Sequence, residues 1–98
     1  MAEITIVYWR DIPAQVIAGK GRRGTKVPLS ERFEQAIDRA AMASGAQGTD
    51  AYLADWRRAA PVTVEGTDAD AARAAAARIE AEYDTGRLRA LIDRGGRD

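Results

Sequence analysis

A chain of 98 residues with 15 basic and 15 acidic side chains makes one domain with a modest core and no net charge at pH 7. This balance excludes a general polyanion binder, so any contact with nucleic acid must come from a local patch. The lack of cysteine and histidine excludes disulfides, thiolate nucleophiles, Cys-based metal sites and the commonest general base, which argues against an enzyme.

The N-terminal part of the chain predicts strands on either side of a glycine-rich basic loop. Residues 3–10 place β-branched and aromatic side chains on both faces, which is typical of a well-covered strand. Pro13 interrupts this strand because proline cannot donate a hydrogen bond to a ladder. A second strand is predicted over 14–18, and residues 26–27 are expected to be briefly extended after the loop.

A helix is predicted to follow Ser30, which stands at an N-cap position and precedes acidic residues that favour the first turn. Its narrow apolar stripe runs to Ser44, and Gly45 suits the left-handed end of a helix.

Residues 51–58 fit two structures, and the sequence leaves both open. The alternation of Tyr52, Ala54 and Trp56 with their neighbours predicts a third strand, whereas an apolar pattern of period 3.6 over the same residues favours a helical turn. Residues 61–64 are expected to add an edge strand.

The C-terminal part of the chain predicts two helices. Thr67 and Asp70 form a start resembling a capping box, followed by an alanine-rich helix to about residue 83. A short last helix follows, and residues 95–98 are expected to form a frayed tail after a single domain over 1–94.

The order of these elements predicts a small α+β domain. We expect a mostly antiparallel sheet of three or four strands, two main helices on one face and a short C-terminal helix. The narrow alanine stripes of both main helices allow close packing onto the sheet, and their small side chains leave room for a partner helix.

The stretch GKGRRG, residues 19–24, has the spacing G-x-G-x-x-G, but no helix begins directly after it, which excludes a dinucleotide fingerprint. A P-loop is excluded as well, because Thr25 and Lys26 stand in the reverse order. Two interpretations remain: a flexible loop, or an anion- or partner-binding loop. In the second, four cations without a local acid would contact phosphates or an acidic protein surface, namely Lys20, Arg22, Arg23 and Lys26.

Both tryptophans stand beside arginines, in the pairs Trp9–Arg10 and Trp56–Arg57. On one face of a sheet these pairs would form a platform on which bases stack. The alternative is that both tryptophans belong to the core and that the arginine stems cover their edges. The acidic residues near Thr67 are explained by helix capping, so no metal site is predicted.

Four segments resemble the small bacterial family described as "virulence factor", whose domain also ends the longer conserved virulence factor C proteins: ITIVYWRDIPAQVIAGKGRRG, LSERFEQAIDRAAM, DAYLADWRR and IEAEYD. The resemblance covers residues 3 to 84 and carries no catalytic signature. It implies a binding or scaffold role, and in alphaproteobacteria an association with folate- and corrinoid-dependent methyl-transfer genes.

We therefore expect a non-enzymatic cytoplasmic interaction domain that binds an acidic protein, such as a methyltransferase component, through the basic loop. No cofactor is expected, and no segment has the composition of a membrane span or leader. The first alternative is a small RNA-binding protein that uses the same loop on phosphates. A second alternative is an enzyme using Tyr8, Lys20 or Asp55, although no spacing supports it.

Overall fold

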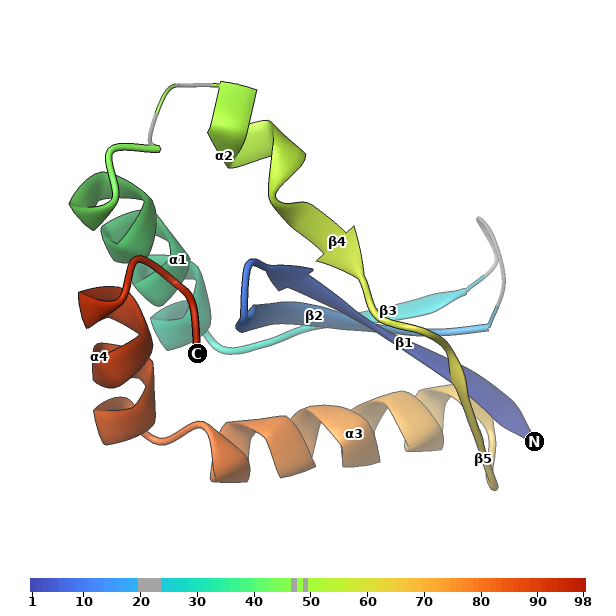
Figure 1. Cartoon of the computed structure of the whole chain (residues 1–98). Helices are drawn as coiled ribbons and strands as arrows, with labels where there is room; N and C mark the ends of the chain where they lie inside the picture. The colour runs from blue at the N-terminus through green and yellow to red at the C-terminus, as the bar shows by residue number, and fades with distance from the viewer. Residues whose placement is uncertain (20–23, 47, 49) are drawn as a thin grey trace.

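The computed structural model describes residues 1–19, 24–46, 48 and 50–98 (Figure 1). Within them the chain forms five strands and four helices. The strands are β1 (Ala2–Trp9), β2 (Ile12–Ala18), β3 (Thr25–Pro28), β4 (Trp56–Arg58) and β5 (Val62–Val64). The helices are α1 (Glu31–Ala43), α2 (Asp50–Ala54), α3 (Asp68–Glu82) and α4 (Thr85–Asp93).

The strands form one antiparallel sheet in the order β3-β2-β1-β4. The strand β5 also pairs with β1, at the N-terminal end of β1 that β4 leaves free. This arrangement confirms the predicted α+β class. The fifth strand is β3, because the segment expected to be only briefly extended forms a full strand, while β4 and β5 pair with opposite ends of β1. Residues 26–27 belong to β3, which pairs fully with β2.

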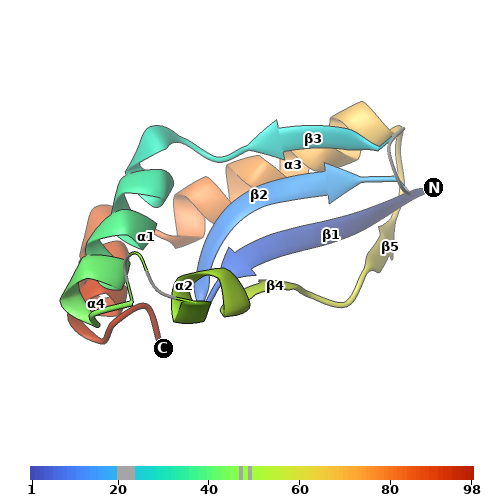
Figure 2. The same cartoon turned by 90° about the horizontal axis from the view of Figure 1, so that it is seen from above.

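The register gives the two faces of the sheet different surroundings. Ile6 lies opposite Val16 on the face that packs on α3, whereas Val7 lies opposite Gln15 on the other face. Seen from above, α3 runs behind β2 and β3, while α1 and α4 pack together at the end of the sheet (Figure 2). The largest fully buried side chains are those of Trp9, Phe33, Ile12, Val16 and Pro13.

Two local expectations differ from the structure. Pro13 does not end a strand but lies inside β2. It pairs with Tyr8 of β1, directly after a shift in register between Val7 and Tyr8, and such an irregularity tolerates a residue without an N–H. Residues 51–58 are divided between the two structures that their pattern allowed, because α2 ends at Ala54 and β4 begins at Trp56.

Both predicted helix starts are confirmed, but their caps differ. The Thr67 hydroxyl accepts a hydrogen bond from the Asp70 N–H at 3.2 Å, as a capping residue does. Ser30 occupies the N-cap of α1 without capping it through its side chain. Its hydroxyl instead donates to Glu80 of α3 at 2.8 Å, so a tertiary contact replaces the local one.

The tail over 95–98 is held by hydrogen bonds, which differs from the frayed tail that its composition suggested. The Gly96 N–H donates to the Leu91 carbonyl at 2.7 Å, and the Gly96 carbonyl accepts from the Asp11 N–H at 2.8 Å. Gly95 and Gly96 have positive φ angles of 70° and 91°, which let the backbone turn back toward the Trp9 ring.

Candidate functional site

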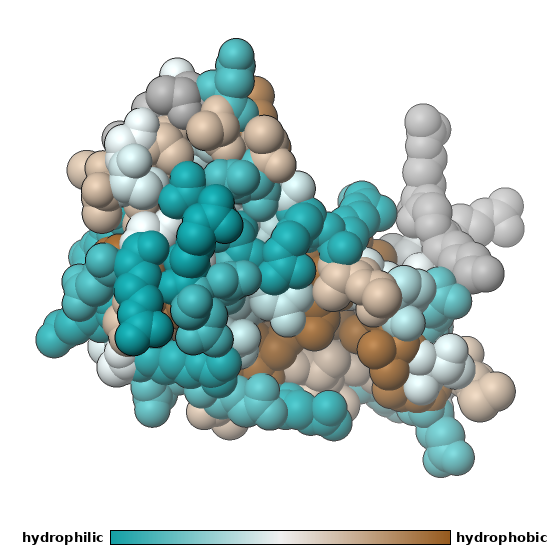
Figure 3. Space-filling model, viewed as in Figure 1, coloured by the Kyte–Doolittle hydropathy of each residue, from teal (hydrophilic) through white to brown (hydrophobic). Residues whose placement is uncertain are grey.

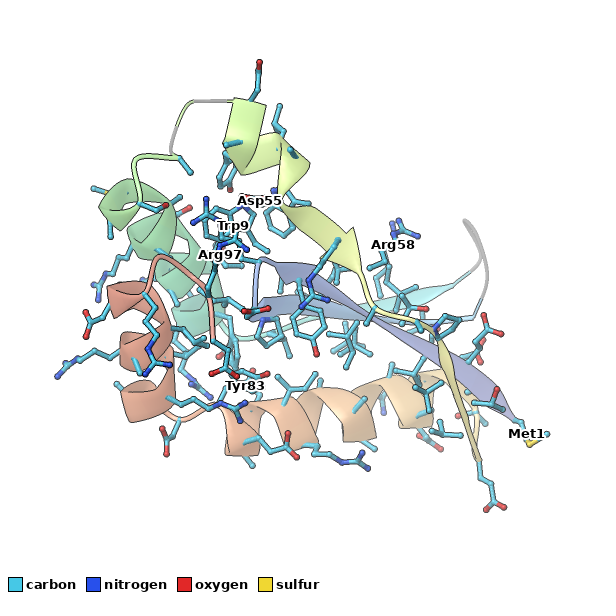
Figure 4. The ribbon with its side chains drawn as sticks, viewed as in Figure 1. Met1, Trp9, Asp55, Arg58, Tyr83 and Arg97 are labelled. Atoms are coloured by element: carbon cyan, nitrogen blue, oxygen red, sulfur yellow. The ribbon has the colours of Figure 1, made fainter. Side chains whose placement is uncertain are left out.

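One of the four cations predicted for the basic loop, Lys26, lies among the described residues. Lys20, Arg22 and Arg23 lie outside the described residues. Lys26 is exposed in β3 and pairs with Ile17, so it lies on the sheet face opposite α3. Arg58, exposed in β4 and paired with Val7, points to the same side (Figure 4). This face therefore carries at least two exposed cations.

Trp9 lies in the core and presents no ring to a ligand. It has no exposed surface, its indole Nε1 donates to the Tyr52 carbonyl at 2.9 Å, and its ring lies 5.7 Å from that of Tyr52. The Arg10 guanidinium carbon lies 4.6 Å from the centre of the Trp9 ring. Arg10 also donates from Nε to the Asp55 carboxylate at 2.8 Å and from Nη1 to the Gly95 carbonyl at 2.6 Å. Arg10 therefore connects Trp9, Asp55 and the C-terminal residues 95–98 through its side chain.

The second tryptophan–arginine pair is arranged differently. Trp56 keeps 37% of its surface exposed. The Arg57 guanidinium lies 4.5 Å from the Tyr8 ring, donates to the Arg10 carbonyl at 2.9 Å and pairs with Asp11 at 3.2 Å. Of the four predicted stacking or surface residues, Trp56 alone combines an aromatic ring with substantial exposure.

An apolar groove of about 560 Å³, which we call the α3 groove, lies between the sheet and α3 (Figure 3). One wall comes from β1, β5 and the segment between β4 and β5, and it includes Ile4, Ile6 and Val62. The other wall is a row of small side chains on α3, including Ala71, Ala74 and Ala75. Charges lie at its border: Glu65, Arg78 and Glu82.

A second cavity of about 330 Å³ lies on the opposite face, between α1, α2 and the strands, and we call it the acidic–aromatic pocket. Tyr52 and Trp56 line one side of it, and Glu34 and Asp38 of α1 line the other. Burial raises the pKa of Tyr52, and the negative charges of Asp38 and Glu34 raise it further. The pocket therefore combines aromatic surface with a negative field.

A third cavity of about 380 Å³ separates α1 from α4 and is lined by several charged residues, including Arg32, Arg39 and Arg89. Arg32 is already engaged, because it pairs with the Glu80 carboxylate at 3.0 Å and donates to the Glu80 and Tyr83 carbonyls. Arg32 therefore serves contacts within the fold, between α1 and the C-terminal end of α3.

Within the described part of the chain, no three carboxylates cluster closely enough to hold a metal ion. In the same residues, no helix is both long and apolar enough to cross a bilayer. Tyr8 lines the α3 groove and Asp55 is bound by Arg10, while Lys20 lies outside the described residues.

The sequence pointed to one of these surfaces only. The alanine stripe of α3 predicted room for a partner helix, but of its alanines Ala72, Ala75 and Ala76 only Ala75 lines the groove. The acidic–aromatic pocket was missed, because its walls come from segments that are far apart in the chain. Its one signal was the pairing of Tyr52 with Trp56, which helical spacing over 51–58 would have brought together.

These features define a small two-layer α+β domain with a mainly apolar groove between its sheet and α3. Residues 7–92, most of the chain, match the family model described as Virulence factor, so the chain belongs to this family. The match confirms the resemblance drawn from the sequence. No curated protein and no solved structure matches the chain.

Proposed function

We propose that this member of the Virulence factor family is a non-enzymatic interaction domain that receives an amphipathic helix of a partner protein in the α3 groove. The observation that carries the proposal is the uncovered part of the sheet beside α3. Elements in an α+β domain bury their apolar faces against a second layer, and here that layer is incomplete.

The width of the sheet defines the space. Neighbouring strands lie about 4.8 Å apart, so four strands abreast span roughly 14 Å, whereas a helix with its side chains is about 10 Å wide. The helix α3 packs mainly on β1, β2 and β3. Viewed from above, β4 and β5 lie clear of it (Figure 2). By these widths α3 leaves about 4 Å of the sheet uncovered, so a partner helix would rest on β4 and β5 and extend past the edge of the sheet.

The side chains along the groove suit such a helix. Ala71, Ala74 and Ala75 follow the i, i+3, i+4 spacing of one helical face, and small side chains let two helices approach to about 8 Å. Opposite them, Val62 keeps 59% of its surface exposed. Covering an exposed apolar side chain in a recess of this kind favours association.

The partner's surface charge would be mixed, because both signs lie on the border of the groove. Arg78 and Glu82 are exposed one turn apart on α3, and Glu65 stands at the end near β5. The basic loop would be a separate contact, since Lys26 lies on the other face of the sheet. A cytoplasmic partner belonging to a methyl-transfer system is what the family resemblance implies, and capture of the partner tests it.

The RNA-binding alternative has less support. A stacking platform needs exposed aromatic rings, and the burial of Trp9 leaves Trp56 as the single tryptophan with an exposed surface. Lys26 and Arg58 still provide positive charge on the face opposite α3. Ribonuclease treatment during capture separates this function from protein binding.

The experiment compares two substitutions of one kind on one helix. Ala74 and Ala77 are both exposed on α3, but only Ala74 lines the groove. Because arginine is a good helix former, Ala74→Arg and Ala77→Arg should both fold, as circular dichroism will verify. Affinity capture from native lysate, with and without ribonuclease, is then repeated with each variant.

We expect wild type and Ala77→Arg to recover the same protein, Ala74→Arg to lose it, and ribonuclease to leave recovery unchanged. A synthetic helix from that protein should then bind wild type directly in calorimetry. Equal recovery by the two variants, or recovery that depends on RNA, would refute the groove as the binding site.

A further inference from the structure

We propose that the acidic–aromatic pocket binds an arginine side chain of a partner protein, with the guanidinium between the ring of Trp56 and the carboxylates of Glu34 and Asp38. The pocket lies on the sheet face opposite the α3 groove, so its test is independent of the function proposed above. Its volume of about 330 Å³ is at the small end of the range for ligand sites, which suits one side chain rather than a whole cofactor.

The aromatic side of the pocket offers a surface for a cation. The rings of Tyr52 and Trp56 lie 6.1 Å apart at 86°, so they form a corner rather than a stack. Trp56 is 37% exposed, which leaves part of its ring available to a ligand. An indole face is the best aromatic partner for a cation, because its quadrupole is negative over the ring.

The opposite side offers charge. Glu34 and Asp38 stand one turn apart on α1, so both carboxylates lie on the helix face that lines the pocket. Among the described residues neither carboxylate accepts a hydrogen bond or forms an ion pair. Two carboxylates without a cation, beside an exposed indole, are complementary to a positively charged group of the size of a guanidinium.

The chemistry favours arginine over lysine. A guanidinium is planar, remains charged at every physiological pH, stacks on aromatic rings and binds carboxylates through two parallel hydrogen bonds. An ammonium is a hydrated point charge and gains less from a pocket with apolar walls. Leu29 and Ile37 provide such walls, because both are buried apolar residues at its inner surface.

The surroundings of the pocket indicate that the arginine belongs to a protein chain. Leu53, next to Tyr52, is 71% exposed, and Met42, one turn beyond Asp38 on α1, is 60% exposed. These apolar side chains have nothing to contact in a free amino acid, whereas residues flanking an arginine in a peptide would cover them.

The experiment is an NMR titration of the full chain that follows backbone amides and the indole N–H signals. The probes are acetyl-Leu-Arg-Leu-amide, its citrulline counterpart, which has the same shape without the charge, and free arginine. We expect shifts at Trp56 and Tyr52, and a Kd about 10-fold lower for the arginine peptide than for the citrulline peptide.

Variants then assign the effect to the pocket. Glu34→Gln combined with Asp38→Asn should abolish the preference for arginine over citrulline, and Trp56→Leu should weaken binding of the arginine peptide. Glu31→Gln is the matched control: it removes one charge from the same helix, but Glu31 does not line the pocket. The amide spectrum of each variant shows directly whether it is folded.

Three results would overturn the proposal. Equal binding of the arginine and citrulline peptides would exclude recognition of charge. A preference that survives in the double variant, or that Glu31→Gln weakens as much, would place the binding elsewhere. Free arginine binding as tightly as the peptide would contradict a protein partner, because the flanking residues would then contribute nothing.

Discussion

Replacing Gly96 by alanine should destabilise the domain strongly, although Gly96 is only two residues from the end of the sequence. Gly96 is buried, has φ of +91°, and contributes both its N–H and its carbonyl to hydrogen bonds. A Cβ at this position would stand 2.8 Å from Cζ3 and 3.2 Å from Cε3 of the Trp9 ring. That ring has no exposed surface, so it has little freedom to move away.

Two costs add up in Gly96→Ala. An L-residue in the left-handed region costs about 1–2 kcal/mol, and an extra carbon forced into a packed core costs about 1–3 kcal/mol. The expected loss in free energy of unfolding is therefore about 2–5 kcal/mol. Domains of this size are stable by about 5–15 kcal/mol in total, so Tm should fall by about 10 °C or more.

Gly66→Ala separates the two costs. Gly66 also has a positive φ, +108°, but a Cβ there meets no atom within 4 Å. This variant should therefore lose about 1–2 kcal/mol from backbone strain alone. Urea denaturation followed by circular dichroism and tryptophan fluorescence measures both values. If Gly96→Ala costs no more than Gly66→Ala, the tail does not pack on Trp9 as described.

Two further predictions concern carboxylates. Burial alone would raise the pKa of Glu80, but hydrogen bonds from Ser30 and the charge of Arg32 outweigh it and hold that pKa below its usual range. Glu80→Gln should therefore lower the free energy of unfolding by about 1–2 kcal/mol at pH 7, a value discounted for the partial exposure of the pair. In urea denaturation this difference from wild type should vanish as the pH falls through the folded pKa of Glu80, because the carboxylate is then protonated. A difference that does not depend on pH would contradict this explanation. In the acidic–aromatic pocket, Asp38→Asn should lower the pKa of Tyr52 toward its ordinary value, because it removes one of the negative charges that raise this pKa. NMR of labelled tyrosine measures the change. An unchanged pKa would mean that Asp38 is distant from the phenol.

The sequence predicted an element correctly where neighbouring residues determine its structure. The alternation over 3–10 gave β1, and Thr67 gave the start of α3, because strand pairing and capping act on neighbouring residues. Residues 51–58 were ambiguous since they contain both a helical turn and a strand within eight residues. Asp55, between the two, is fixed by Arg10, which lies 45 positions earlier in the chain.

The remaining differences have tertiary causes. Ser30 gives its hydroxyl to Glu80 although its own helix start lacks a side-chain cap. Beyond its local hydrogen bond to Leu91, Gly96 is ordered by Trp9 and Asp11 at the other end of the chain, contacts for which the local sequence has no signal. For the same reason the sequence drew attention to the continuous basic loop, whereas the α3 groove and the acidic–aromatic pocket are assembled from separate segments.

The two proposed binding surfaces lie on opposite faces of one sheet, and this placement gives a prediction that neither surface gives alone. Ile6 faces the α3 groove and Val7 the other side, so the backbone of β1 separates the two sites. Substitutions in the groove should therefore leave arginine-peptide binding unchanged, and Trp56→Leu should leave capture of the helical partner unchanged, because sites without shared contacts behave additively. Measuring both activities in Ala74→Arg and Trp56→Leu checks this. Loss of both activities in either variant would mean that one partner wraps around the edge formed by β4 and β5, so that the two surfaces are parts of a single interface.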